Sequence, residues 1–155
     1  MNITKITKEN LDAENFFIGE SRFNGHLEID GGLGFVKFKA ALSASGYIYT
    51  EAGTGIEAGE GIEAGTGIKA GTGIKAGEGI KAGTGIKAGT GIKAGTGIEA
   101  GWGIEAGLSI VCKAISSKYR IFAGICNWKI PQESETEIRC AKISGTVAYG
   151  KVIKI

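Results

Sequence analysis

The sequence predicts an all-β protein built around a short β-solenoid, and three observations lead to this fold class. Isoleucine recurs at every sixth position from Ile56 to Ile110 without interruption. Each isoleucine from Ile56 to Ile104 sits in the hexad x-G-I-[EK]-A-G, so two glycines accompany it. The flanking segments contain short runs of strand-forming residues separated by Asn-Gly, Asp-Gly and Ser-Gly pairs, which are typical of turns between strands.

The hexad is incompatible with a helix and fits a strand followed by a bend. Successive isoleucines would be rotated by about 240° on a helix and would form no apolar stripe. In a strand, the isoleucine points inward, the following Glu or Lys points outward, and the alanine faces inward or begins the corner. We expect the glycine after alanine to make the turn, because glycine adopts a positive φ without penalty. Such short strands are stable only if identical coils stack above and below them.

The hexad resembles the hexapeptide repeat of left-handed parallel β-helices, in which three phrases form one triangular coil. Threonine stands two residues before the isoleucine in most phrases, which matches the small residue of that family. Glu60, Glu78 and Trp102 depart from the pattern, because a large or charged side chain there would have to enter the triangle. A flatter solenoid with twelve residues per coil is the alternative, and it would place these side chains on an exposed bend.

The chain divides into three parts of one structural domain: an N-terminal cap over residues 1–52, the hexapeptide solenoid over 53–110, and an irregular coil with a C-terminal β cap over 111–155. In the first part we expect a short helix over 6–14 with Thr7 as its N-cap. Aromatic residues are concentrated in the same part, and we expect them to plug the open end of the solenoid. They are Phe16, Phe17, Phe23, Phe35, Phe38, Tyr47 and Tyr49.

The third part keeps the character of the repeat but loses its regularity. Ile121-Phe122-Ala123-Gly124 echoes the Ile-x-Ala-Gly phrase, which indicates that the coil continues. The segment NWKIPQESETE contains the single proline, Pro131, and is expected to form an exposed loop. The final stretch, EIRCAKISGTVAYGKVIKI, is predicted to form two strands around Ser-Gly. We expect them to cover the C-terminal edge of the solenoid, so that it cannot pair with strands of other molecules and aggregate.

The charged position of the repeat runs from acidic to basic and back to acidic. In chain order it reads Glu57, Glu63, Lys69, Lys75, Lys81, Lys87, Lys93, Glu99, Glu105. With eighteen residues per coil, Glu57 would lie over Lys75 and Lys87 under Glu105, as attractive cross-strand neighbours. One interpretation is a surface ladder that fixes the register of the coils. The other is a lysine belt that binds an acidic partner.

Composition and motifs argue against catalysis and against several kinds of partner. The net charge of +2 does not predict direct binding of nucleic acid. His26 is the single histidine, and no phosphate-binding loop, metal-ligand spacing or cofactor motif is present, so we expect no catalytic, metal or cofactor residues. Cys112, Cys126 and Cys140 are expected to be reduced thiols. The charged N-terminal stretch predicts no secretory signal, and no apolar run is long enough to span a membrane.

The phrases NFFIGESRFNGHLEI, EAGWGIEAGLSI, KAISSKYRIFAGICNW and EIRCAKISGTVAYG resemble small glycine-rich proteins encoded by bacteriophages and prophages, which carry a variable number of hexads between similar ends. This resemblance implies an accessory protein in the cytoplasm of the infected bacterium. By analogy with anti-CRISPR proteins, it implies a non-enzymatic inhibitor that binds a host protein or ribonucleoprotein complex. Flat-sided β-helices also associate with each other, so a homo-oligomer remains open.

Two alternative functions are a structural protein of the phage virion or tail and a hexapeptide-type acyltransferase that would depend on His26. For the binding function, the candidate partner-binding residues are the lysines of the repeat and the two tryptophans, which are favoured at interaction hot spots. They are Lys69, Lys75, Lys81, Lys87, Lys93, Trp102 and Trp128.

Overall fold

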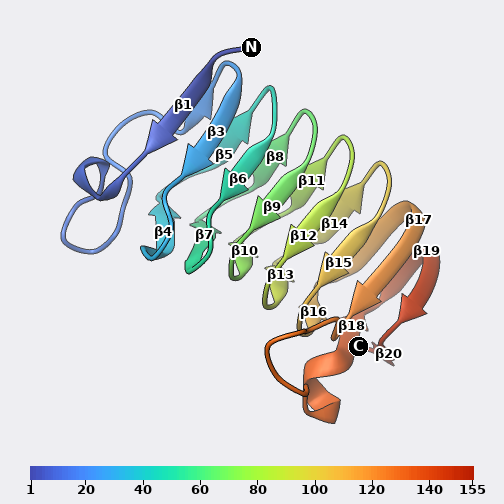
Figure 1. Ribbon diagram of the computed structural model, residues 1–155. Coiled ribbons are helices and arrows are strands. Elements are labelled where there is room, and N and C mark those ends of the chain that lie inside the picture. The colour runs from blue at the N-terminus through green and yellow to red at the C-terminus, as the bar shows by residue number, and fades with distance from the viewer.

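A computed structural model, which describes residues 1–155, confirms the predicted β-solenoid. The chain winds through stacked coils from the N-terminus to the C-terminus, and the strands of successive coils pair in parallel (Figure 1). Within the repeat, Ile74 pairs with Ile56 on one side and with Ile92 on the other. Each coil therefore contains eighteen residues, three hexads, and the twelve-residue alternative is wrong.

The three hexads of a coil form three faces, which we name A, B and C. Face A contains β1 (Ile3–Ile6), β3 (His26–Ile29), β6 (Ile48–Thr50), β9 (Ile68–Ala70), β12 (Ile86–Ala88) and β15 (Ile104–Ala106). Face B contains β2 (Arg22–Phe23), β5 (Leu42–Ala44), β8 (Ile62–Ala64), β11 (Ile80–Ala82) and β14 (Gly97–Ala100). Face C contains β4 (Gly34–Phe38), β7 (Thr54–Ala58), β10 (Ile74–Ala76), β13 (Ile92–Ala94), β16 (Ile110–Val111), β18 (Glu137–Cys140) and β20 (Lys151–Lys154).

Two long strands near the C-terminus join faces B and A. The first half of β17 (Ala114–Ala123) pairs with β14 on face B, and its second half pairs with β15 on face A. Strand β19 (Lys142–Tyr149) belongs to the next coil toward the C-terminus. It pairs in parallel with both halves of β17, so it also crosses from face B to face A. The predicted continuation of the coil through Ile121 is therefore confirmed, because Ile121 pairs with Ile104 of the repeat.

The core is a single shaft of aliphatic side chains. Every isoleucine of the repeat is at most 2% exposed, and the alanine two residues later also faces inward. Each fully buried isoleucine contributes about 1.5–3 kcal/mol relative to an exposed one, so the ladder of isoleucines is the main source of stability. The Glu or Lys between them points to solvent, as the alternation of a strand requires.

The glycine after each alanine is needed for close packing between coils, and our expectation of a positive φ is wrong. Gly53 is the only glycine of the repeat with a positive φ. At Gly83, an added Cβ would overlap the carbonyl oxygen of Gly65 in the preceding coil, and the same overlap recurs at Gly77, Gly95 and Gly101. Hydrogen bonds between coils pull the backbones together here, for example from the Gly83 N–H to the Ala64 carbonyl at 3.1 Å.

The second glycine of the hexad has more room. A Cβ at Gly85 would lie 3.5 Å from the carbonyl oxygen of Gly103, an ordinary contact. The chain itself places Arg120 at the equivalent position before Ile121, with its side chain exposed. The two glycines of the hexad therefore have different roles.

The residues that depart from the hexapeptide pattern do not enter the core. Glu60, Glu78 and Trp102 lie at the bends between faces with exposed side chains. The bend turns this position away from the shaft, so its size is not limited by the triangle. The expected conflict at these positions is absent.

The N-terminal end is closed, although not by the expected helix. Residues 3–6 form strand β1, and only one turn of 3-10 helix, η1 (Lys8–Asn10), follows Thr7. The expected helix cannot begin at Ile6, because Ile6 is paired with Ile29 of β3 as the last residue of β1. Leu11 and Phe17 pack against the end of the core, and the Phe17 ring lies within 5.7 Å of the rings of Phe23 and Phe38.

Not all N-terminal aromatic residues belong to this cap. Tyr47 and Tyr49 line the outside of face A, and Phe35 lies on the outside of face C under the ammonium group of Lys75 at 4.5 Å. Phe16 does not pack on the core either, and its ring centroid lies 5.4 and 5.6 Å from the ammonium groups of Lys37 and Lys39. The expectation that the whole aromatic set plugs the shaft is therefore wrong for these four residues.

At the C-terminal end, the predicted loop is confirmed. Residues 124–136 bulge from the corner between β17 and β18, include the short helix η2 (Glu133–Thr136), and are mostly exposed. The final stretch differs from the prediction, because Ser144 and Gly145 lie inside the continuous strand β19 instead of between two strands. No helix of the structure is long and apolar enough to cross a membrane.

The two glycine positions make a prediction about stability. Gly83→Ala should lower the free energy of unfolding by about 1–3 kcal/mol, because the added methyl group forces two coils apart. Gly85→Ala should change it by less than about 0.5 kcal/mol, because the methyl group meets only ordinary contacts. Urea unfolding followed by circular dichroism measures both values, and equal destabilisation of the two variants would contradict the close-packing role.

Candidate functional site

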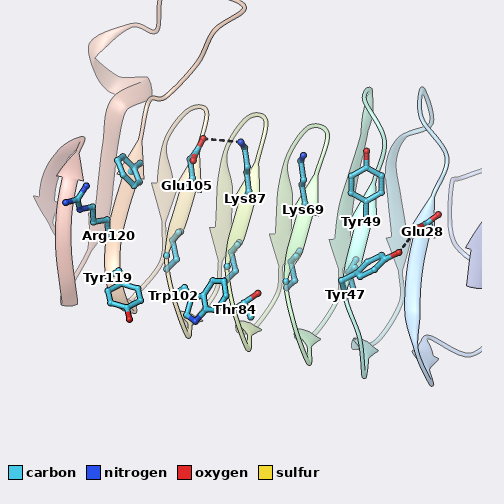
Figure 2. Close-up of a pocket in the computed structure, with 18 residues that line it drawn as sticks. Glu28, Tyr47, Tyr49, Lys69, Thr84, Lys87, Trp102, Glu105, Tyr119 and Arg120 are labelled. Atoms are coloured by element: carbon cyan, nitrogen blue, oxygen red, sulfur yellow. Dashed lines mark hydrogen bonds and ion pairs between the residues drawn. The ribbon is translucent and has the colours of Figure 1, made fainter. Parts of the chain in front are cut away.

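A groove with a volume of about 930 Å³ lies on face A. One wall is the column of outward side chains at the centre of face A, one from each coil. In register order this column is Glu28, Tyr49, Lys69, Lys87, Glu105 and Phe122. The members of this column that Figure 2 labels, from Glu28 to Glu105, form its upper row of side chains.

The second wall lies at the bend between faces B and A. Trp102 follows Thr84 in this column, and Tyr119 follows Trp102, as hydrogen bonds between their backbones show at 2.9 and 2.8 Å. Trp102 and Tyr119 are more than half exposed, and their rings lie in the lower row of Figure 2. Tyr47 closes this row at the N-terminal end.

The floor between the two walls is made by the second glycines of three hexads, Gly67, Gly85 and Gly103. An added Cβ would meet only an ordinary contact at Gly85, whereas at Gly67 and Gly103 it would lie 3.2 and 3.1 Å from a neighbouring oxygen, so only the smallness of Gly85 is not required by coil packing. At about 4.8 Å per coil, the groove extends roughly 20 Å along the solenoid from Tyr47 to Tyr119.

Tyr47 is held rigidly by its neighbours. Its hydroxyl donates a hydrogen bond to the Glu28 carboxylate at 2.6 Å, and this bond raises the pKa of the phenol. Its ring stacks on the His26 ring with 3.9 Å between centroids, while its backbone N–H donates to His26 Nδ1 at 3.0 Å. His26 therefore has a structural role in orienting the end of the groove.

The groove contains three cations and two carboxylates, and two of the cations are without an ion-pair partner. Glu28 accepts the Tyr47 hydrogen bond, and Glu105 forms an ion pair with Lys87 at 3.5 Å. Lys69 and Arg120 have no carboxylate partner, and the Lys69 ammonium group lies 5.8 Å from the Tyr49 ring centroid. The groove thus combines aromatic rings with cations that are available to a ligand.

The five lysines of the repeat do not form one belt, because successive hexads lie on different faces. Lys69 and Lys87 line the face A groove, Lys81 lies on face B, and Lys75 and Lys93 lie on face C. The expected neighbours Glu57–Lys75 and Lys87–Glu105 are in register, and the second pair is within ion-pair distance. Exposed pairs of this kind contribute about 1 kcal/mol or less.

The two tryptophans lie on either side of face A. Trp102 lines the groove, whereas Trp128 belongs to the loop after β17 and donates from Nε1 to the Gly89 carbonyl at 3.4 Å. A smaller pocket beside Trp128 shares Lys87 and Glu105 with the groove. The structure therefore brings four of the seven candidate residues to face A and its edge.

The sequence analysis missed Tyr119 and Arg120 as groove residues. Tyr119 stands two residues before Ile121, as Trp102 stands two residues before Ile104, so an alignment of the irregular coil with the hexad would have found it. Tyr47 has no such signal, because the coils before residue 53 contain more than eighteen residues.

The remaining chemical groups lie away from the groove. Cys112 and Cys140 are fully buried in adjacent coils, and Cys126 is partly exposed. Burial raises the pKa of Cys112 to about 12, with a smaller contribution from Cys140, and burial also raises the pKa of Cys140. No three His, Cys, Asp or Glu side chains come together in a way that could hold a metal ion.

Comparison of the chain with protein-family models, with curated proteins and with solved structures finds no match.

The cysteine environments predict selective alkylation. With iodoacetamide at pH 8, Cys126 should react while Cys112 and Cys140 stay unmodified, because only the thiolate attacks and burial suppresses it. Peptide mass spectrometry identifies the modified sites, and alkylation in urea provides the control in which all three react. Equal modification of the three thiols in the native protein would contradict the buried positions.

Proposed function

We propose that this chain is a non-enzymatic binding protein that holds an acidic segment of a partner macromolecule along the face A groove. The observation that carries the proposal is the convergence of exposed aromatic rings and unpaired cations on one face, over a floor without side chains. Aromatic residues and arginine are enriched at protein interfaces and dominate their binding energy.

The rigidity of the scaffold supports a binding role. Each groove residue sits on a strand or bend that is hydrogen-bonded to the coils on both sides, so the surface is ordered before a partner arrives. A preorganised surface loses little conformational entropy on association. The positive free charges favour an acidic partner and speed its approach.

The resemblance to phage-encoded proteins directs the proposal toward a host partner. In its specific form, the protein acts in the bacterial cytoplasm as an inhibitor that occupies an acidic surface of a host defence protein, free or within a ribonucleoprotein complex. Inhibition of this kind requires only a stable complex, and a rigid groove about 20 Å long supplies a suitable surface.

A matched pair of glycine variants tests the groove. Gly85→Gln should abolish partner recovery from a bacterial lysate, because the new side chain fills the groove floor, where Arg120 shows that a long side chain fits. Gly79→Gln makes the same change on face B and should retain the partner recovered by the unmodified chain. Equal recovery by both variants, or no specific partner for the unmodified chain, would refute the groove as the binding site.

Single side chains on the walls should weaken the same complex. Trp102→Ala removes an exposed aromatic anchor and should raise the dissociation constant by about 30-fold, or 2 kcal/mol, as for an interface hot spot. Lys69→Glu should weaken binding and reduce its dependence on salt, whereas Lys81→Glu on face B should not. Calorimetric titration with the identified partner measures these values, and a tenfold or greater loss from Lys81→Glu would place the interface elsewhere.

A further inference from the structure

The solenoid contains its own example of a side chain that lies on a column of second glycines. On face C, Phe35 pairs with Gly55, and Gly73 follows Gly55 in the next coil. The Phe35 ring lies along this column, because an added Cβ would come within 2.9 Å of its Cε1 at Gly55 and within 3.0 Å of its Cζ at Gly73. Both glycines are buried, and the Lys75 ammonium group lies 4.5 Å from the ring centroid. A column of second glycines therefore accepts an aromatic ring beneath a lysine.

Face A repeats this column without a ring over its glycines. Tyr47 has the place of Phe35, and Gly67 and then Gly85 follow it in register. Lys87 stands two residues after Gly85, as Lys75 stands after its own glycine on face C. Gly67 and Gly85 are partly exposed, and a Cβ added at Gly67 would meet no atom of Tyr47 within 4 Å. The floor of face A thus has the parts of the face C arrangement except the ring.

Two contacts hold the Tyr47 ring away from the floor. The ring stacks on His26 with 3.9 Å between centroids, and the hydroxyl donates to Glu28 at 2.6 Å. In Figure 2 this hydroxyl is directed toward Glu28, on the side of Tyr47 opposite Lys69. Phe35 has no hydroxyl and cannot be held in the same way. The residue that covers the glycines on face C is therefore tied back on face A.

We propose that the groove binds an aromatic side chain of the partner, seated over Gly67 and Gly85 beneath the ammonium group of Lys87. This inference rests on the proposed function and names the side chain that the acidic segment presents to the floor. A cation over the face of an aromatic ring is attracted by the ring, so this site prefers an aromatic side chain to an aliphatic one of similar size.

The ion pair of Lys87 does not prevent this contact. Lys87 lies 3.5 Å from Glu105, and both side chains are more than a third exposed. Exposed pairs of this kind contribute about 1 kcal/mol or less, so the lysine is free to turn over a ring.

Face A is the face that is suited to such a ligand. Face B has the same column of second glycines, but its single lysine, Lys81, lies between Glu63 and Glu99 in register. Two carboxylates there repel an acidic segment, and no aromatic residue lines the pocket on face B. On face C, Phe35 already covers the glycines. Face B therefore provides the control positions for a test of face A.

Titration with a short peptide, followed by nuclear magnetic resonance, tests the site. The probe is acetyl-Asp-Asp-Phe-Asp-Asp amide, added to the unmodified chain. It should shift the α-proton resonances of Gly67 and Gly85 upfield, because an aromatic ring shields nuclei above its face, and leave those of Gly61 and Gly79 on face B unchanged. The same peptide with cyclohexylalanine in place of phenylalanine should bind about three-fold more weakly, because the cation–π contact is lost, and should cause no upfield shift.

Three variants separate the parts of the argument. Lys87→Met keeps an unbranched side chain without the charge and should remove the preference for phenylalanine over cyclohexylalanine. Lys81→Met makes the same change on face B and should retain that preference. In the free chain, Phe35→Leu should move the α-proton resonances of Gly55 and Gly73 downfield, because it removes the ring that serves as the template.

Four results would each overturn the inference: equal affinities for the two peptides, no upfield shift at Gly67 and Gly85, a preference that survives Lys87→Met, or unchanged resonances in Phe35→Leu. Failure of this inference is distinguishable from failure of the proposed function. If Gly85→Gln abolishes recovery of the partner but the phenylalanine peptide causes no upfield shift, the groove remains the binding site and only the aromatic ligand is refuted.

Discussion

The close approach of successive coils at the corner glycines is the constraint on which the structure depends. Where Gly83 lies against Gly65, the space between two backbones is too small for a Cβ atom. This contact brings the coils within hydrogen-bonding distance and stacks each isoleucine on the isoleucine of the next coil. A larger residue at this position would separate the strands and loosen the isoleucine shaft together, because both depend on the same spacing between coils.

The other outward positions of the hexad are free of this constraint, and the groove is built from them. The bend position accepts Thr84, Trp102 or Tyr119 without disturbing the core, and the second glycine can be replaced, as Arg120 shows. A repeat with so few essential positions can vary its surface while its backbone stays the same. The aromatic wall, the cations and the glycine floor of face A are all formed by residues at these outward positions.

The first and last coils of the solenoid each have a neighbouring coil on one side only, and the two ends differ in how their apolar side chains are covered. At the N-terminus, an irregular segment folds Leu11 and Phe17 over the shaft, so the first coil is covered within the same chain. At the C-terminus, β19 and β20 leave Ile143 and Val147 partly exposed, and no further strand of the chain pairs with their outer edges.

The sequence by itself determined the β-solenoid, the inward isoleucines and alanines and the outward charges, because these follow from a strict six-residue period. It left eighteen and twelve residues per coil as alternatives, so the neighbours of Glu57 and Lys87 in the next coil were decided by the structure. It did not determine that Glu60 and Trp102 point outward or why Gly83 must be glycine, because both depend on the path of the backbone at the bends. Only the tertiary structure decided which lysines share a face. It also decided that Tyr47, Trp102 and Tyr119 line one groove, since the coils on either side of the regular repeat contain more or fewer than eighteen residues. The open C-terminal edge was hidden for the same reason, because burial depends on the coil that follows and not on the residues of the strand.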